Sequence, residues 1–333
     1  MSCDLFTSYF PKVLTVALLG YTGTVAIQHV NVVPFTINAA VIVITLGVDM
    51  YTYFKIVSVG AGSPLDFPEL HIQNVQDAEE GHVFPPEFLS NRSVTLKHNG
   101  RFRICRNCKV WKPDRSHHCS SCNKCFLKMD HHCPWFASCI GFKNQKLFIQ
   151  FLLYTTWYAV FVFMTTGLQL WKWLDNKMYE KELIDLSLMT VWLLSIISCI
   201  SMFAFTSYSI YLVTKNTTTI EMYGWTHYRS QLEIVNDSRR TSMSATDNVF
   251  DLGTRKANWE AVMGKSWREW LLPVRTDAEL KSRNTLDEKG LYFKIRSDVY
   301  QDIHESMDLQ QQLMKRLTPR SSTELRTPML SKP

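Results

Sequence analysis

Two interleaved sets of cysteine and histidine residues give this chain its clearest chemical pattern. The stretch between residues 105 and 148 contains seven of the nine cysteines of the chain. Within it, the spacing C-x2-C-x9-H-x6-C occurs twice, and the second copy begins fourteen residues after the first. The copies are Cys105, Cys108, His118 and Cys125, then Cys119, Cys122, His132 and Cys139. Three cysteines and one histidine suit a closed tetrahedral zinc site, so the spacing predicts two structural zinc ions in one compact domain.

Three further residues with reactive side chains are left over by these two sets. They are Asp130, His131 and Cys133, which are an acid, a base and a nucleophile close together in the chain. A thiol attacks as its thiolate, which a neighbouring histidine favours, and a base oriented by a third group is the general arrangement of nucleophilic catalysis. We therefore predict that Cys133 is a nucleophile, His131 its base and Asp130 the group that orients the base. Two alternatives stay open: Cys133 could be a spare zinc ligand, and His131 could bind metal in place of His132.

The same segment resembles the cysteine-rich domain of the DHHC protein S-acyltransferases, the palmitoyltransferases. It matches C-x2-C-x9-H-C-x2-C-x2-C-x4-D-H-H-C-x5-C-x4-N-x3-F without a gap, as far as Asn144 and Phe148. The resemblance implies that Cys133 takes an acyl group from palmitoyl-CoA as a thioester, becoming self-acylated, and passes it to a cysteine of a membrane-associated protein. It also implies a base at His131, an orienting acid at Asp130, and two zinc sites on the eight ligands named above.

Four apolar blocks surround this segment and predict how it is held. They cover residues 13–33, 35–57, 147–170 and 186–213, each near the roughly 20 residues that cross a bilayer as a helix. The first block could instead be a signal peptide, but a second block follows after a very short link. We therefore expect an α-helical integral membrane protein with four transmembrane helices and a two-zinc cysteine-rich domain between the second and third.

The predicted organisation has four parts. Residues 1–57 hold the N-terminal segment and the first two helices, and residues 58–146 form a loop that carries the zinc domain at about 103–148. Residues 147–213 hold the last two helices, and residues 214–333 form a C-terminal region that ends in a polar stretch with the composition of a disordered tail.

The distribution of charge predicts which side of the membrane the zinc domain occupies. Residues 59–146 contain twelve lysines and arginines, and the link between the first two apolar blocks contains none. The positive-inside rule and the need for reduced thiols both place the loop in the cytosol, and four crossings then place both termini there. Disulfides are a rival use of the cysteines, but seven is an odd number and the spacing suits metal. The net charge of +6 is spread without a dense basic run, which argues against nucleic acid as a partner.

Basic and polar residues outside the ligand sets extend the predicted site. Four lysines that flank the nucleophile are predicted to hold the phosphates of CoA, with anionic lipid headgroups as the alternative: Lys124, Lys128, Lys143 and Lys146. Thr218, Thr219 and Glu221 fit the T-T-x-E motif of the family, although a plain helix N-cap would also explain them. Asn258 lies in a stretch that resembles the C-terminal element of the family.

Segments along most of the chain resemble one branch of the family. SPLDFP, VWKPDRSHHCSSC and DEKGLYF are similar to the fungal vacuolar-membrane palmitoyltransferases, which implies the vacuole membrane and substrates among proteins of vacuole fusion and inheritance. The predicted function is thus a protein S-acyltransferase that works in two steps. The main alternative is a membrane-anchored zinc module that binds a partner without catalysis. A channel or transporter is disfavoured because the four apolar blocks contain few charges.

Overall fold

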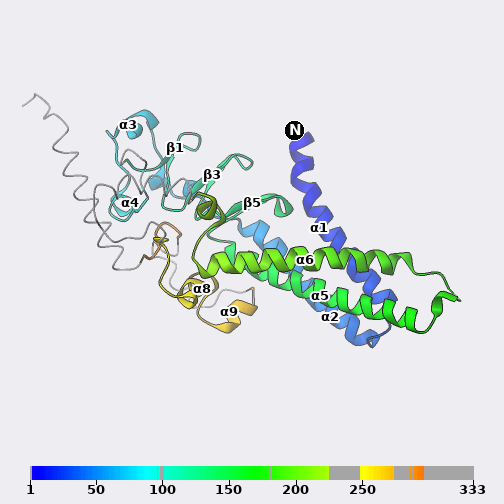
Figure 1. Cartoon of the computed structure of the whole chain (residues 1–333). Coiled ribbons are helices and arrows are strands. Elements are labelled where there is room, and N and C mark those ends of the chain that lie inside the picture. Colours follow the sequence, from blue (N-terminus) through cyan, green and yellow to red (C-terminus); the bar gives the residue numbers. More distant parts are fainter. Residues whose placement is uncertain are drawn as a thin grey trace, which may run out of the picture.

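Four long helices dominate the structure, a computed structural model that describes residues 2–95, 97, 101–180, 182–224, 248–273, 286 and 289–295. Within that part of the chain, the helices of 25 residues or more are α1 (Ser2–His29), α2 (Phe35–Val59), α5 (Gln145–Asp175) and α6 (Leu186–Thr214). α2, α5 and α6 lie side by side, α1 leans across them, and the cysteine-rich region lies beyond one end of the bundle (Figure 1).

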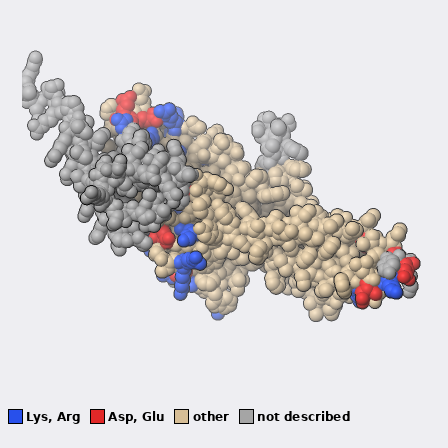
Figure 2. All heavy atoms as spheres, in the orientation of Figure 1, with Lys and Arg blue, Asp and Glu red and all other residues tan. Residues whose placement is uncertain are grey.

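The surface of the bundle is that of a membrane protein. Each of the four helices is long and apolar enough to cross a bilayer. In Figure 2, the charged side chains that are visible gather toward the two ends of the molecule, and the band between them on this face is uncharged. The predicted fold class, four membrane helices with a Cys/His-rich domain between the second and third, is confirmed.

The helix ends differ from the apolar blocks in two places. α1 begins at Ser2 and ends at His29, four residues before the end of its apolar block. Val33 precedes Pro34, and a residue before proline disfavours the helical conformation, so the last apolar residues form the link. α5 continues to Asp175, because neither glycine nor proline interrupts the chain between its apolar block and that residue.

Polar side chains inside the bundle join the helices to one another. Asn38 of α2 donates a hydrogen bond to the Ala26 carbonyl of α1 at 2.9 Å. Thr155 of α5 donates to the Asp49 carboxylate of α2 at 3.1 Å. Hydrogen bonds between membrane helices of this kind hold the bundle together where no water is present to compete.

The cysteine-rich region is built from three short antiparallel hairpins in the described residues. They are β1 (Ile104–Cys105) with β2 (Val110–Trp111), β3 (His117–Cys119) with β4 (Lys124–Phe126), and β5 (His131–Cys133) with β6 (Ser138–Ile140). The fourteen-residue repeat is therefore visible as structure, and it extends to a third hairpin, in which Phe136 stands at the place of the second cysteine. Lys109, Asn123 and Ala137 occupy the same place in the three turns, with φ of 52°, 48° and 44°.

Short helices fill the remaining described segments. They are η1 (Pro64–Asp66), η2 (Pro68–Leu70), α3 (Val75–Glu80), α4 (Glu87–Ser90), η3 (Pro134–Phe136), η4 (Met178–Glu180), α8 (Arg255–Met263) and α9 (Trp267–Leu271). α8 and α9 lie beside the domain-side end of α5 and α6 (Figure 1). Asn258 in α8 donates to the Thr214 carbonyl at 3.0 Å, so it satisfies a carbonyl at the last turn of α6. The predicted tail beyond residue 295 lies outside the described residues.

Candidate active site and metal centres

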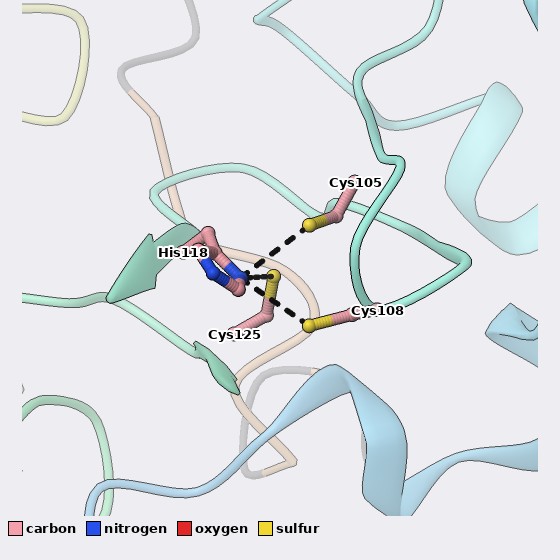
Figure 3. A group of neighbouring side chains, drawn as sticks. All are labelled: Cys105, Cys108, His118 and Cys125. Carbon is pink, nitrogen blue, oxygen red and sulfur yellow. Dashed lines mark hydrogen bonds between the residues drawn. The ribbon is translucent and has the colours of Figure 1, made fainter. Parts of the chain in front are cut away.

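The first predicted ligand set forms a close cluster. The sulfurs of Cys105, Cys108 and Cys125 lie 3.5, 3.3 and 3.8 Å from Nδ1 of His118. Figure 3 shows the three sulfurs converging on this one ring nitrogen. The side-chain amide nitrogen of Asn107 lies 3.5 Å from the other ring nitrogen, Nε2.

The second set repeats this geometry. The sulfurs of Cys119, Cys122 and Cys139 lie 3.6, 3.3 and 3.7 Å from Nδ1 of His132. All four ligand atoms of each set lie within 4.8 Å of one another. A tetrahedral ion with zinc–sulfur and zinc–nitrogen bonds of about 2.3 and 2.0 Å separates its ligands by about 3.5 Å, so both clusters are compatible with zinc.

The hairpins explain the spacing of the ligands. His118 pairs with Cys125 across β3 and β4, and His132 pairs with Cys139 across β5 and β6. Each histidine and its last cysteine are therefore cross-strand neighbours on one face, where opposite Cβ atoms are about 5 Å apart. The first two cysteines of each set come from the strand and turn of the preceding hairpin, so each cluster joins two successive hairpins.

Asp130 and His131 form a hydrogen-bonded pair beside the second cluster. Oδ2 of Asp130 lies 2.6 Å from Nδ1 of His131. Thr219 donates its backbone N–H to Oδ1 at 2.8 Å and its hydroxyl to Oδ2 at 3.0 Å. Nε2 of His131 is buried and makes no hydrogen bond within the part of the chain that the structure describes. This pattern fixes the carboxylate on one ring nitrogen and leaves the other for a reacting group.

The electrostatics of the pair favour the protonated form of the His131 imidazole. Burial alone would raise the pKa of Asp130, but the hydrogen bond and charge of His131 and the Thr219 donors hold it below its ordinary value. Burial lowers the pKa of His131, yet the Asp130 carboxylate and the Cys133 thiol outweigh this effect and raise the pKa to about 9. The imidazole therefore binds a proton firmly once it has taken one.

Cys133 lies in apolar surroundings at the membrane end of the domain. Its side chain is 4% exposed and packs in a cluster with Tyr53, Phe136 and Phe148. The ring of Phe148 approaches the His131 ring edge-on, with centroids 5.3 Å apart. Because the cluster also draws on α2, α5 and α6, the thiol lies where the cysteine-rich domain meets the helix bundle.

A buried arginine that the sequence analysis missed braces this site. Arg115 is 2% exposed, and its guanidinium donates to both carboxylate oxygens of Glu221, at 2.7 and 2.8 Å, and to the side chain and backbone of Asn216, each at 2.9 Å. Burial would raise the pKa of Glu221, but Arg115 holds it below its usual range. A charged residue directly before the S-H-H-C run is the signal that could have marked Arg115, although its partners lie about a hundred residues away.

The T-T-x-E residues and Asn144 are placed where they support the same centre. Thr218 accepts the backbone N–H of Glu221 at 3.2 Å, and Glu221 in return accepts the N–H of Thr218 at 2.8 Å. Thr219 holds Asp130, as described above. Asn144 accepts the Gly141 N–H at 2.9 Å and donates to the Cys139 carbonyl at 3.1 Å, which ties the second cluster to the start of α5.

The four predicted CoA lysines are not equivalent. Lys143 is half-exposed and lies 3.4 Å from Asp66, the side chain of Lys124 is partly buried, and the Nζ atom of Lys146 is buried. Lys128 is 6% exposed, and burial, together with the charge of Arg115, lowers its pKa to about 7. Because Lys128 belongs to the buried group around Arg115 and Glu221, we omit it from the proposed CoA contact.

Comparisons with known proteins agree with this geometry. The family model described as DHHC palmitoyltransferase matches residues 98–226. The chain is 51% identical to Palmitoyltransferase PFA3 of Saccharomyces cerevisiae, over 96% of this chain and 94% of that protein. It is 48% identical to Palmitoyltransferase PFA3 of Kluyveromyces lactis, over 97% of this chain and 99% of that protein. The similarity to Palmitoyltransferase PFA3 of Candida albicans is 38% identity, over 95% and 91% of the two chains.

Proposed function

Since the chain belongs to the DHHC palmitoyltransferase family and is a protein S-palmitoyltransferase, we propose that Cys133 carries the palmitoyl group between donor and substrate. The observation that carries this proposal is the Asp130–His131 pair beside the one thiol of the domain that neither ligand set contains. Palmitoyl-CoA is the proposed donor, and a cysteine of a membrane-associated protein is the proposed acceptor.

The first step would form an acyl-enzyme. Nε2 of His131 accepts the proton of the Cys133 thiol, and the thiolate attacks the thioester carbonyl of palmitoyl-CoA. The bond between that carbonyl and the CoA sulfur breaks, and the CoA thiolate leaves with the proton from His131. Asp130 keeps the imidazole in the required tautomer and stabilises its charged form, because its carboxylate faces Nδ1.

The second step would reverse the roles of the two thiols. His131 accepts the proton of the substrate cysteine, and that thiolate attacks the carbonyl of the Cys133 thioester. The Cys133 sulfur leaves and regains its proton. One thiol cannot hold donor and acceptor at once, so the kinetics should be ping-pong. Zinc bound on the two ligand sets would supply folding energy to the domain, and the reaction itself uses only the side chains named here.

The position of Cys133 also fits the physical state of the acyl chain. Burial in lipid is worth about 0.8 kcal/mol per CH₂, so a sixteen-carbon chain stays in the bilayer at a gain on the order of 10 kcal/mol. The thiol must therefore reach the interface, and Cys133 packs against side chains of three membrane helices.

We assign membrane anchoring to residues 1–57 and 147–213, the acyl-transfer chemistry to residues 58–146, and support of the active site to residues 214–333.

A labelling assay separates this function from its main alternative. Purified protein incubated with labelled palmitoyl-CoA should acquire a label that hydroxylamine removes, because hydroxylamine cleaves thioesters. A zinc module that only binds a partner would explain the two clusters but would acquire no such label.

The lysines give a prediction on donor binding. Lys124→Gln and Lys143→Gln should each raise the KM for palmitoyl-CoA in detergent by about fivefold, because each loses a contact of about 1 kcal/mol with a phosphate. Lys109→Gln, at an exposed position in the first hairpin, is the matched control and should leave KM unchanged. An unchanged KM in detergent, with loss of activity in anionic liposomes, would assign the lysines to lipid headgroups.

The proposed topology, with the zinc domain and both termini in the cytosol, predicts that no glycan is attached. Asn91, Asn216 and Asn236 begin glycosylation sequons, and all three lie on the side assigned to the cytosol. Asn216 is also buried and bonded to Arg115, while Asn236 lies outside the described residues. Treatment with a glycosidase should leave the electrophoretic mobility unchanged. A shift at any of the three positions would contradict the topology.

The location and substrates follow from the resemblance to the fungal vacuolar branch. We propose the vacuole membrane as the site of action and proteins of vacuole fusion and inheritance as acceptors. A fluorescently tagged chain should label the vacuolar rim in yeast, and an exclusive signal at another membrane would contradict this location.

A further inference from the structure

A short C-terminal segment packs against the zinc domain far from its place in the sequence. Residues 289–295, drawn in orange in Figure 1, lie beside this domain. Leu291 is 6% exposed and belongs to an apolar cluster with Leu70 and Leu127. Gly290 has a φ of 74°, and a Cβ there would lie 2.5 Å from the Phe142 ring, so only glycine allows this close approach.

This segment places an aromatic ring on the buried arginine of the site. The guanidinium carbon of Arg115 lies 5.3 Å from the centroid of the Phe293 ring and 4.5 Å from that of Phe250. Phe293 also meets Phe142 edge-on, with centroids 5.9 Å apart. Two rings thus cover a guanidinium whose N–H groups are held by Glu221 and Asn216, which gives the cation a largely water-free environment.

Arg115 connects this cover to the reacting residues by two routes. Its side chain holds Glu221, which lies two residues after Thr219, and Thr219 holds both oxygens of Asp130. Its backbone carbonyl accepts the N–H of Met129 at 3.0 Å, directly before Asp130. A displacement of Arg115 therefore reaches the carboxylate that orients His131.

We propose that residues 289–295 act as a positioning strap for the active site, with Phe293 holding the Arg115 guanidinium on Glu221. The strap keeps Asp130 and His131 aligned with Cys133, and this proposal rests on the reaction proposed above. When the Phe293 ring is lost, water reaches the Arg115 guanidinium and competes for its hydrogen-bond partners. The contact between Arg115 and Glu221 then loosens, while the two metal clusters stay intact. Phe293 is thus a positioning residue that touches neither acyl-CoA nor the acceptor.

Matched variants of the full-length protein test the strap. Phe293→Leu keeps the apolar volume but removes the π face, Phe293→Tyr keeps the ring, and Lys294→Ala changes an exposed neighbour. In single-turnover self-acylation with labelled palmitoyl-CoA, Phe293→Leu should be about threefold to tenfold slower, the range of a partly desolvated cation–π contact. Phe293→Tyr and Lys294→Ala should react as the unchanged protein does. The KM for palmitoyl-CoA and the zinc content should be the same in all four proteins.

Two results would overturn the strap. Either Phe293→Leu reacts at the unchanged rate, or it loses zinc, which would make Phe293 a folding residue. Failure of the unchanged protein to self-acylate would instead refute the reaction at Cys133, so the two failures are distinguishable.

A double-mutant cycle tests whether Phe293 acts on Asp130 through the contacts of Arg115, Glu221 and Thr219. Thr219→Val removes the hydroxyl donor to Asp130 while keeping the side-chain shape. If Phe293 acts through Thr219 and Asp130, the two changes loosen the same carboxylate. The fold decrease in the self-acylation rate of the double variant should then be smaller than the product of the fold decreases of the two single variants. Losses that multiply as independent factors would contradict the proposed route.

Discussion

Cys133→Ser is expected to abolish self-acylation and transfer while both zinc ions stay bound. A serine hydroxyl in this position is nearly the size of the thiol but holds its proton far more tightly, so the Asp130–His131 pair cannot generate the nucleophile. Removal of a nucleophile in a covalent mechanism lowers the rate by more than about 10³-fold. Zinc should stay because Cys133 lies outside both clusters.

For the Cys133→Ser variant, we would measure how much hydroxylamine-sensitive label it takes up from labelled palmitoyl-CoA, and the zinc content of the same sample. Cys199→Ser in α6 is the matched control, since this cysteine lies outside the zinc domain and should not affect either result. Label that persists in Cys133→Ser would place the acyl group on another residue. Fewer than two zinc ions per chain in the active unchanged protein would refute the assignment of the ligands.

Replacement of the two adjacent histidines should give opposite results. His131→Ala removes the base and should slow thioester formation by about 10²–10⁴-fold, with both zinc ions retained. His132→Ala removes a ring nitrogen that lies 3.3–3.7 Å from three sulfurs, so it should lose metal and destabilise the domain. Metal analysis and thermal unfolding of the two variants decide between the roles. Zinc loss in His131→Ala with a folded, metal-loaded His132→Ala would reverse the assignment.

The sequence was sufficient for the elements whose signal is local. The fourteen-residue repeat predicted both ligand sets, and the structure places His132, and not His131, among the sulfurs. Apolar composition predicted the four membrane helices, because the length needed to cross a bilayer is fixed by its thickness. The helix ends were less predictable, since they depend on proline and on packing.

Contacts between distant segments could not be predicted in this way. Thr219 reaches Asp130 across 89 residues and Arg115 reaches Glu221 across 106 residues, and no periodic pattern in the chain encodes either contact. The T-T-x-E motif was found through its resemblance to the family, but its partners were not. Phe293 lies in the DEKGLYF segment that resembles the fungal branch, but this resemblance does not reveal which cation the ring will cover.

The third hairpin shows how the reactive thiol of Cys133 is related to the zinc ligands of the first two hairpins. Cys133 stands fourteen residues after Cys119 and twenty-eight after Cys105, at the place where each earlier hairpin carries the first cysteine of a ligand set. A thiolate bound to zinc is protected from reaction, so the loss of the partner ligands releases this sulfur for chemistry. The turn of this hairpin then needs contacts other than a metal bond, and Tyr53 of α2 makes two of them. Its ring stacks on that of Phe136, with centroids 5.0 Å apart, and its hydroxyl donates to the Trp135 carbonyl. The strands of this hairpin still carry His132 and Cys139 of the second set, but a contact with a membrane helix holds its turn, where a metal ion would hold the turns of the other two. A chelator should therefore loosen all three hairpins at their ligands, while detergents that disturb the helix bundle should act most directly on the turn after Cys133.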